Sequence, residues 1–360
     1  MSREPTPSLS RMTDQEGLEP GVTSADVSLG RRLLNWKTIG SIIFGIVLLV
    51  LLFRYVFNQD LGEIWTRISH ANPAFLLLAF VAYYLTFPLR GFRWAYLLRS
   101  SGTPIATTDA TEILFLSWFV NCVVPAKLGD VYRAYLLRGN YGASMSRTVG
   151  TIFIERSTDI VVIFALALAA GFWSFRGRAR PDVDAVFLAG FVVAIGLVIF
   201  LIALRFFGHR LTRFLPGRVA ELYERFHEGS TRGLTRRTLP VLVALTVAIW
   251  ILEGFRLYFV IRALNLPEVG LGISASIFVT LIGALLTAVP LTPAGVGFVE
   301  AAIVIALGFY GIAGGPAGAV ALADRAISIL SVIVLGGILY AFSRKVRIAH
   351  GVVTAQPAPD

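Results

Sequence analysis

The 360-residue chain has few of the residues that build catalytic and metal-binding sites. It contains one cysteine, Cys122, and four histidines, and their scattered positions lack the spacing of a metal-ligand cluster. One cysteine also excludes a fold held together by disulfide bonds. The Walker motif G-x-x-x-x-G-K-[ST] is absent, which excludes ATP hydrolysis through that motif. We therefore predict neither enzymatic activity nor a cofactor or metal.

Charged residues are scarce as well. Only 15% of the residues are charged, 56% are hydrophobic and the mean hydropathy is +0.74. A soluble domain carries roughly 25% charged residues, so the composition excludes an ordinary soluble protein and predicts an all-α integral membrane protein. The net charge of +10 is attributed to cytoplasmic loops, where membrane proteins concentrate Lys and Arg. No nucleic-acid partner is predicted.

Long apolar runs give the expected topology. A membrane-spanning helix needs about 20 mostly apolar residues, and about six stretches qualify. These are residues 39–57, 73–89, 158–175, 186–204, 239–261 and 319–342. The polar, Pro- and Ser-containing residues 1–36 are predicted to form a disordered cytoplasmic tail. The transmembrane domain then covers residues 37–345, and residues 346–360 form a C-terminal cytoplasmic tail.

Two further apolar regions are interrupted. Residues 113–124 run into PAKLGDVYRAYLLRGN, and residues 274–289 run into PLTPAGVGFVEAAIVIALGFYGI. Each region has a short apolar arm, a Pro/Gly break and a second arm. Broken backbone is tolerated at membrane depth only where protein or water covers it. The pattern therefore predicts two re-entrant helical pairs.

The distribution of basic residues predicts the orientation. With the N-terminus inside, the cytoplasmic segments hold 24 Lys and Arg residues and the outer segments hold 7. Because cytoplasmic loops carry the basic excess, both termini are predicted to be cytoplasmic. The basic stretch at 208–237 is expected to lie on the membrane rather than to bind nucleic acid.

The chain contains an internal repeat. GFRWAYLLR at 91–99 matches GFRLYFVIR at 254–262 with an offset of 163 residues. PAKLGDV matches PAGVGFV with an offset of 168, and ERSTDI matches DRAISI with an offset of 169. The repeat units span about 73–175 and 239–342. An odd number of crossings between the two GFR segments predicts that the units are inverted, an architecture that recurs in transporters with a site at the repeat interface.

The two breaks are candidate anion sites. A helix N-terminus has unpaired N–H groups, and Gly129, Gly295 and Gly297 would let a phosphate approach the backbone. Lys127 and Arg133 would add positive charge in the first unit. Two alternatives remain open: the glycines only allow close helix packing, or the two basic residues lie on an interfacial helix that touches anionic lipid.

Ionisable residues also lie in or beside the spans. A charge at a helix centre costs about 3 kcal/mol, so these residues are expected to face the protein interior as a polar pathway. The alternatives are that the arginines near span ends extend to the lipid headgroups, or that neighbouring acid–Arg pairs are purely structural. The residues are Arg90, Arg93, Glu155, Arg156, Asp159, Glu253, Arg256, Glu300, Asp324 and Arg325.

These motifs together resemble the lysylphosphatidylglycerol synthase transmembrane-region family, also called flippase-like domain proteins. The resemblance rests on PAKLGDVYRAYLLR, ERSTDI, PAGVGFVEAA and the GFR segments, and covers about residues 39–345. It implies an inner-membrane protein that moves a phospholipid or polyprenyl-type lipid between leaflets. By position, the motif residues are Lys127, Gly129, Asp130, Arg133, Glu155, Arg156, Asp159, Gly295, Gly297 and Glu300.

The match has two departures from the family pattern. Ser328 stands where the second repeat would need an acid equivalent to Asp159, so a symmetric role for that acid is in doubt. Relatives fuse this domain to a cytosolic aminoacyl transferase, whereas only about 18 residues follow the last predicted span here. We therefore expect no transferase.

Three functions remain open at this stage. The first is a lipid translocase. Its predicted headgroup-binding residues are Arg93, Lys127, Gly129, Asp130, Arg133, Arg156, Gly295, Gly297 and Arg256. The second is a non-transporting partner of a lipid-modifying or glycosyltransferase enzyme. The third is an enzyme acting on lipid headgroups, for which the sequence offers no nucleophile–base pair.

Overall fold

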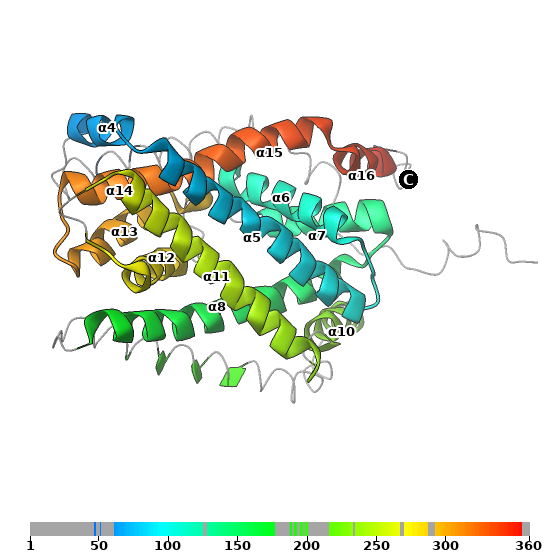
Figure 1. Cartoon of the computed structure of the whole chain (residues 1–360). Helices are drawn as coiled ribbons and strands as arrows, with labels where there is room; N and C mark the ends of the chain where they lie inside the picture. Colours follow the sequence, from blue (N-terminus) through cyan, green and yellow to red (C-terminus); the bar gives the residue numbers. More distant parts are fainter. Residues whose placement is uncertain are drawn as a thin grey trace, which may run out of the picture.

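The computed structural model describes residues 61–124, 128–176, 216–232, 235–266, 270–286 and 292–354, together with a few single positions between 47 and 200. In these residues the regular structure is helical, as predicted (Figure 1). The helices are α4 (Leu61–Ser69), α5 (Pro73–Ser100), α6 (Thr107–Val123), α7 (Leu128–Tyr141), α8 (Met145–Phe175), α10 (Gly217–Arg232), α11 (Thr238–Ala263), α12 (Ile273–Leu286), α13 (Phe298–Gly308), α14 (Gly315–Arg325), α15 (Ser331–Phe342) and α16 (Arg344–Thr354).

Four helices are long and apolar enough to cross a membrane. They are Pro73–Ser100, Met145–Phe175, Thr238–Ala263 and the continuous run Gly315–Phe342. Four of the predicted spans are thus confirmed as apolar helices of spanning length. The spans predicted at 39–57 and 186–204, the tail at 1–36 and the end of the chain beyond residue 354 lie outside the described residues.

Two of these helices extend further than their apolar composition predicts. Helix α5 continues past residue 89 to Ser100, and α8 begins at Met145, thirteen residues before the predicted start. The added turns carry Arg90, Arg93 and Glu155, whose side chains are buried. A hydropathy window assigns such residues to loops, but a charge paired inside the protein does not interrupt a helix.

Both interrupted regions consist of two short helices, as predicted. Helix α6 ends at Val123 and α7 begins at Leu128. Helix α12 ends at Leu286, a 3₁₀ turn occupies Pro293–Gly295, and α13 begins at Phe298. Pro125 to Lys127 and residues 287–291 lie outside the described residues. Whether each pair returns to its own side of the membrane stays a prediction.

The helices that carry the GFR motifs, α5 and α11, pack side by side along much of their length (Figure 1). Each has a neighbour at its glycine: a Cβ on Gly91 would lie 2.8 Å from the Thr111 Cα atom in α6, and one on Gly254 would lie 3.0 Å from the Ile277 Cα atom in α12. Glycine is therefore required at both positions for the close approach of these helices.

Across the repeats, α12 packs on α8 and α15 packs on α6. The long apolar run Gly315–Phe342 is not a regular α-helix, because Ala326–Leu330 is π-helical between α14 and α15. Helix α5 is interrupted in a different way by Pro88, whose missing N–H cannot bond to the carbonyl four residues earlier. These helices enclose the site described next.

Candidate functional site

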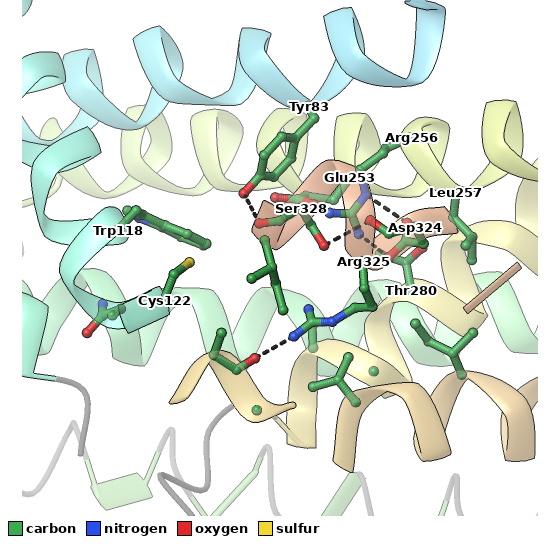
Figure 2. A pocket seen from close by; sticks show the side chains of 18 of the residues that line it. Tyr83, Trp118, Cys122, Glu253, Arg256, Leu257, Thr280, Asp324, Arg325 and Ser328 are labelled. Carbon is green, nitrogen blue, oxygen red and sulfur yellow. Dashed lines mark hydrogen bonds and ion pairs between the residues drawn. The ribbon is translucent and has the colours of Figure 1, made fainter. Parts of the chain in front are cut away.

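A cavity of about 150 Å³ lies between the helices of both repeat units (Figure 2). Residues of α5, α6, α8, α11, α12, the Pro293–Gly295 turn, α13, α14 and the π-helical segment contribute to its wall. The lining residues are Tyr83, Trp118, Asn121, Cys122, Arg156, Trp250, Glu253, Arg256, Leu257, Thr280, Gly283, Ala284, Thr292, Ala294, Gly295, Val299, Ile303, Asp324, Arg325, Ser328 and Ile329.

The cavity wall combines cations with aromatic rings. Three arginines line it against two carboxylates, those of Glu253 and Asp324. The guanidinium of Arg90 lies between two of its indoles, 4.7 Å from the ring centroid of Trp118 and 5.6 Å from that of Trp250. A cation stacked on a desolvated indole gains on the order of 2 kcal/mol.

Several hydrogen-bond donors at the cavity lack an acceptor among the described residues. The Thr280 hydroxyl is buried, with 6% of the residue exposed, and has no partner; the Trp250 indole N–H also has none. Buried donors are normally bonded, so this part of the wall suits a ligand that supplies acceptor oxygens.

Arg325 is held on one side of the cavity by the second break. Its Nε donates to Glu300 Oε1 at 3.0 Å. Its Nη2 donates to the carbonyl oxygen of Ala294, the dashed line at Arg325 in Figure 2. The Ala294 φ of 51° turns that carbonyl out of the regular helical direction. The Nη1 group of Arg325 has no acceptor among the described residues and is available to a ligand.

The helix N-termini at the breaks already have internal acceptors. Gly297 N–H donates to Glu300 Oε2 at 2.7 Å, and Gly129 N–H donates to Asn121 Oδ1 at 2.9 Å. Gly297 has a φ of 90°, which favours glycine. These side chains occupy the N–H groups that the sequence analysis assigned to an anion. Of the three glycines, Gly295 lines the cavity.

Arg93 and Arg133 are buried in an ionic cluster next to the cavity, and neither of them lines the cavity wall. Arg93 Nη1 lies 2.6 Å from Asp159 Oδ1, and its Nη2 lies 2.6 Å from Glu155 Oε1. Arg133 pairs with the other oxygen of Glu155 and stacks 3.9 Å from the Trp94 ring centroid. Because Arg133 is 2% exposed, it does not lie on an interfacial helix surface in contact with lipid.

The adjacent acid–Arg residues do not pair with each other. Arg156 Nη2 lies 3.0 Å from Asp130 Oδ1, and its Nη1 lies 3.9 Å from Asp159 Oδ2. Its neighbour Glu155 pairs with Arg93 and Arg133 instead. Neighbouring residues of a helix point in different directions, so each member of such a pair contacts a different partner.

The second repeat follows the same arrangement. Arg256 Nε lies 2.9 Å from Asp324 Oδ1, while the next residue, Arg325, pairs with Glu300. Arg256 also pairs at 3.1 Å with Glu253, which in turn pairs at 2.8 Å with Arg90. The helix positions of Arg256 and Asp324 correspond to those of Arg93 and Glu155 in the first repeat.

The charges around the cavity, most of them buried, are balanced within each cluster. One cluster joins three arginines to three carboxylates, a second joins two to two, and the third is a single pair. The clusters are Arg93, Arg133, Arg156, Asp130, Glu155 and Asp159; Arg90, Arg256, Glu253 and Asp324; and Arg325 with Glu300. Balanced pairing offsets the large cost of desolvating each charge.

The predicted site residues therefore divide into three sets. The first set lines the cavity and consists of Arg156, Glu253, Arg256, Gly295, Asp324 and Arg325. The second set does not line it and consists of Arg93, Gly129, Asp130, Arg133, Glu155, Asp159, Gly297 and Glu300. The third is Lys127, which lies outside the described residues. The sequence analysis missed Thr280, Trp118 and Trp250. A hydroxyl inside the apolar run ISASIFVTLIGALL was the one available signal for Thr280.

Comparison with known proteins identifies the family. The model of the lysylphosphatidylglycerol synthase TM region matches residues 39–336. The chain belongs to this family. The matched residues include three of the four described spans in full, the fourth as far as residue 336, and both breaks. The protein is thus a membrane protein with the helices of a known transmembrane domain.

Relatives of this lysylphosphatidylglycerol synthase TM-region protein include archaeal membrane proteins. A UPF0104 membrane protein of Methanocaldococcus jannaschii is 34% identical over 222 residues, covering 62% of this chain and 93% of the relative. A UPF0104 membrane protein of Methanothermobacter thermautotrophicus is 25% identical, covering 76% and 87%. Glycosyltransferase AglD of Haloferax volcanii is 27% identical over 303 residues, which cover 74% of this chain and 48% of AglD.

Proposed function

We propose that this protein translocates an anionic lipid, a phospholipid or a polyprenyl-linked lipid, between the leaflets of the cell membrane, with the phosphate-bearing headgroup in the central cavity. The observation that carries the proposal is the set of donors without acceptors at the cavity wall, Thr280 Oγ1, Trp250 Nε1 and Arg325 Nη1. A phosphate oxygen accepts from such donors, and hydrogen bonds to charged groups are stronger than neutral ones.

The cavity size supports binding of a headgroup alone. Pockets that enclose a whole drug-sized molecule measure about 300–1,000 Å³, whereas this cavity measures about 150 Å³. A phosphate group fits this space and the acyl chains of a lipid do not. The chains therefore stay in contact with the membrane while the headgroup is held.

An inverted repeat would let the two units alternate access to this headgroup site. The Arg90–Glu253 ion pair supports the inversion, because its members are 163 positions apart, the offset of the GFR motifs. Equivalent positions contact each other where a two-fold axis passes between two units. With the inside-biased basic residues, the proposal gives about six spans, two re-entrant pairs and cytoplasmic termini.

A second candidate function has support from one relative. The chain matches about half of a protein named as a glycosyltransferase, so a domain of this kind also occurs within a larger enzyme. In this alternative the protein is a non-transporting membrane partner of a glycosyltransferase or a lipid-modifying enzyme, and its cavity holds the lipid substrate for that enzyme.

Transport by the purified protein distinguishes the two functions. Vesicles would carry fluorescent phosphatidylglycerol in one arm and a fluorescent polyprenyl phosphate in the other, and a membrane-impermeant quencher would report movement between leaflets. We expect faster movement than in protein-free vesicles for one of the two lipids, and a loss of at least fivefold in Arg325→Gln.

Arg67→Gln is the matched control, because Arg67 forms an exposed pair with Glu63 on α4, away from the cavity. It should transport at the wild-type rate. Movement of both lipids at the protein-free rate would overturn translocation and leave the partner function, which crosslinking to a glycosyltransferase in native membranes would then test.

A further inference from the structure

A groove leads from one end of the helix bundle toward the cavity. It lies between α5, α6 and α15 and is lined by Tyr84, Phe87, Pro88, Thr107, Thr108, Thr111, Glu112, Phe115, Leu335 and Leu339. The cavity is lined nearby by Tyr83, the residue before Tyr84, by Trp118, one turn after Phe115, and by Ser328 of the π-helical segment that precedes α15. The groove and the cavity are therefore neighbours, and we call the two together the crevice.

The groove changes in polarity along its length. Its outer end has three threonines and Glu112, and Glu112 accepts hydrogen bonds from Lys345 Nζ at 2.7 Å and from Ser343 Oγ at 2.6 Å. These partners lie where α15 ends and α16 begins. The inner end has aromatic and leucine side chains. The apolar end of the groove is therefore the end next to the cavity, where an acyl chain attached to a headgroup in the cavity would lie.

A single layer of side chains separates the groove from the cavity. Phe87 lines the groove and Trp118 lines the cavity, and their rings make an edge contact with centroids 5.9 Å apart. Across the same layer the Tyr84 hydroxyl bonds to Ser331 Oγ at 2.7 Å and the Tyr83 hydroxyl donates to the Ser328 carbonyl at 3.0 Å. Few bonds therefore hold α5 against the other wall.

Both walls at this layer are interrupted helices. Pro88 breaks the hydrogen-bond ladder of α5, and the π-helical Ala326–Leu330 precedes α15. Their counterparts in the other repeat are regular, since Ile251 stands in α11 at the position of Pro88 and α8 is continuous from Met145 to Phe175. Proline and π-helical turns are the usual sites of helix bending.

At the corresponding place of the other repeat, buried apolar side chains fill the contact between two helices. There α12 packs on α8 through Ile163, Ala167 and Leu281, all buried. Helix α15, by contrast, has Val332 and Gly336 as its buried residues and exposes large apolar side chains such as Ile338, which is 54% exposed. Among the described residues, α15 thus buries fewer side chains against its neighbours than the corresponding part of α8 does.

We propose that the crevice between α5, α6 and α15 is the entry route of the transported lipid, and that it holds an acyl chain in the groove while the headgroup occupies the cavity. The Phe87–Trp118 layer is the gate of this route, and the π-helical segment is the hinge on which α15 moves. The inference rests on the proposed headgroup site and adds the side from which the lipid enters and the place of its chain.

Two neighbouring positions on α15 provide a matched test. Leu339 lines the groove, whereas Ile338 faces away from it. A benzophenone amino acid at either position would be photolysed in vesicles of one part phosphatidylglycerol to nine parts phosphatidylcholine. We expect the lipid crosslinked at 339 to be at least threefold enriched in phosphatidylglycerol, and the lipid crosslinked at 338 to have the bulk composition. Equal composition at both positions would overturn the proposal.

Lipid transport by variants at the same two positions, 338 and 339, tests this inference separately from the proposed function. Leu339→Trp should slow lipid movement at least fivefold, while Ile338→Trp should leave it unchanged. Equal rates in both variants, with an active wild type, would overturn the route and leave translocation intact. If the wild type moves no lipid, translocation is wrong, and the crosslinking result alone decides whether the crevice binds anionic lipid.

Discussion

Arg90 of α5 and Glu253 of α11 form an ion pair of 2.8 Å, although they are 163 positions apart in the sequence. Both side chains are at least 94% buried, with exposed fractions of 3% and 6%. Their contact joins the two repeat units at equivalent positions. The pair therefore links the stability of one unit to the presence of the other.

Removing one partner of this pair should destabilise the fold. Glu253→Gln leaves the Arg90 guanidinium without its carboxylate partner, whereas Arg256 keeps Asp324, and breaking a buried pair costs about 3 kcal/mol or more. Denaturant unfolding in detergent micelles measures the loss. Glu221→Gln is the control, because the Arg225–Glu221 pair is exposed and should cost less than about 1 kcal/mol. Equal losses in the two variants would contradict a structural role for Glu253.

Removing the Thr280 hydroxyl should separate stability from function. The hydroxyl is buried without a partner among the described residues, so the nearly isosteric Thr280→Val should not lower the free energy of unfolding. If the hydroxyl donates to a bound headgroup, its loss costs about 1 kcal/mol, which corresponds to roughly fivefold weaker binding of phosphatidylglycerol. Equilibrium binding in micelles and thermal unfolding test both parts. A less stable variant with unchanged binding would contradict this assignment.

Adding a methyl group at the GFR glycines should push helices apart. In Gly91→Ala the new Cβ would lie 2.0 Å from Thr111 Oγ1, and in Gly254→Ala it would lie 2.4 Å from Ile277 Cγ1. Overpacking of this kind typically costs 1–3 kcal/mol, so each variant should lose about 2 kcal/mol. Gly308→Ala is the control because no atom lies within 4 Å of its added Cβ. Its free energy of unfolding should change by less than about 1 kcal/mol.

The contact between α16 and α6 should depend on pH. Hydrogen bonds from Lys345, and then from Tyr141, lower the pKa of Asp109 below its usual value. A carboxyl group with a lowered folded-state pKa stabilises the fold above its unfolded pKa of about 4, and this contribution is lost as pH falls through the folded value. Protection of the α16 amides, relative to the exchange rate of an unfolded peptide at the same pH, should therefore fall below about pH 4.

Lys345 determines the alkaline limit of the pH range in which the contact between α16 and α6 is stabilising. Burial lowers its pKa, but hydrogen bonds to Asp109 and Glu112 outweigh burial and raise the pKa above its usual value. Its contribution is complete below the unfolded pKa of about 10.4 and is lost as pH rises through the folded value. Lys345→Met should make exchange in α16 fast at neutral pH and nearly independent of acid. Unchanged protection in this variant would exclude the contact as the cause.

The spans and the breaks were predictable because both depend on local composition. Runs such as residues 239–261 must be apolar to cross a membrane, and a Pro/Gly break shows in the sequence wherever it occurs. The sequence also identified the buried ionisable residues individually. It did this because a charge inside an apolar run is costly and so is conspicuous.

The pairing of those charges was not predictable from the sequence. Arg93 bonds to Asp159, 66 positions away, and Arg256 bonds to Asp324, 68 positions away, so the partners are defined only by the packing of separate helices. The internal cap at Gly297 is different, because Glu300 three residues later is a recognised capping pattern. We assigned Gly297 to an anion when the sequence already contained its acceptor.

The equal numbers of arginines and carboxylates in the three buried clusters have an electrical consequence. A membrane potential of 100 mV does about 2.3 kcal/mol of work on each unit of net charge that crosses the bilayer. The described clusters contain six positive and six negative side chains, so they contribute no net gating charge when they move together. Any voltage dependence of transport would then report the charge of the lipid itself.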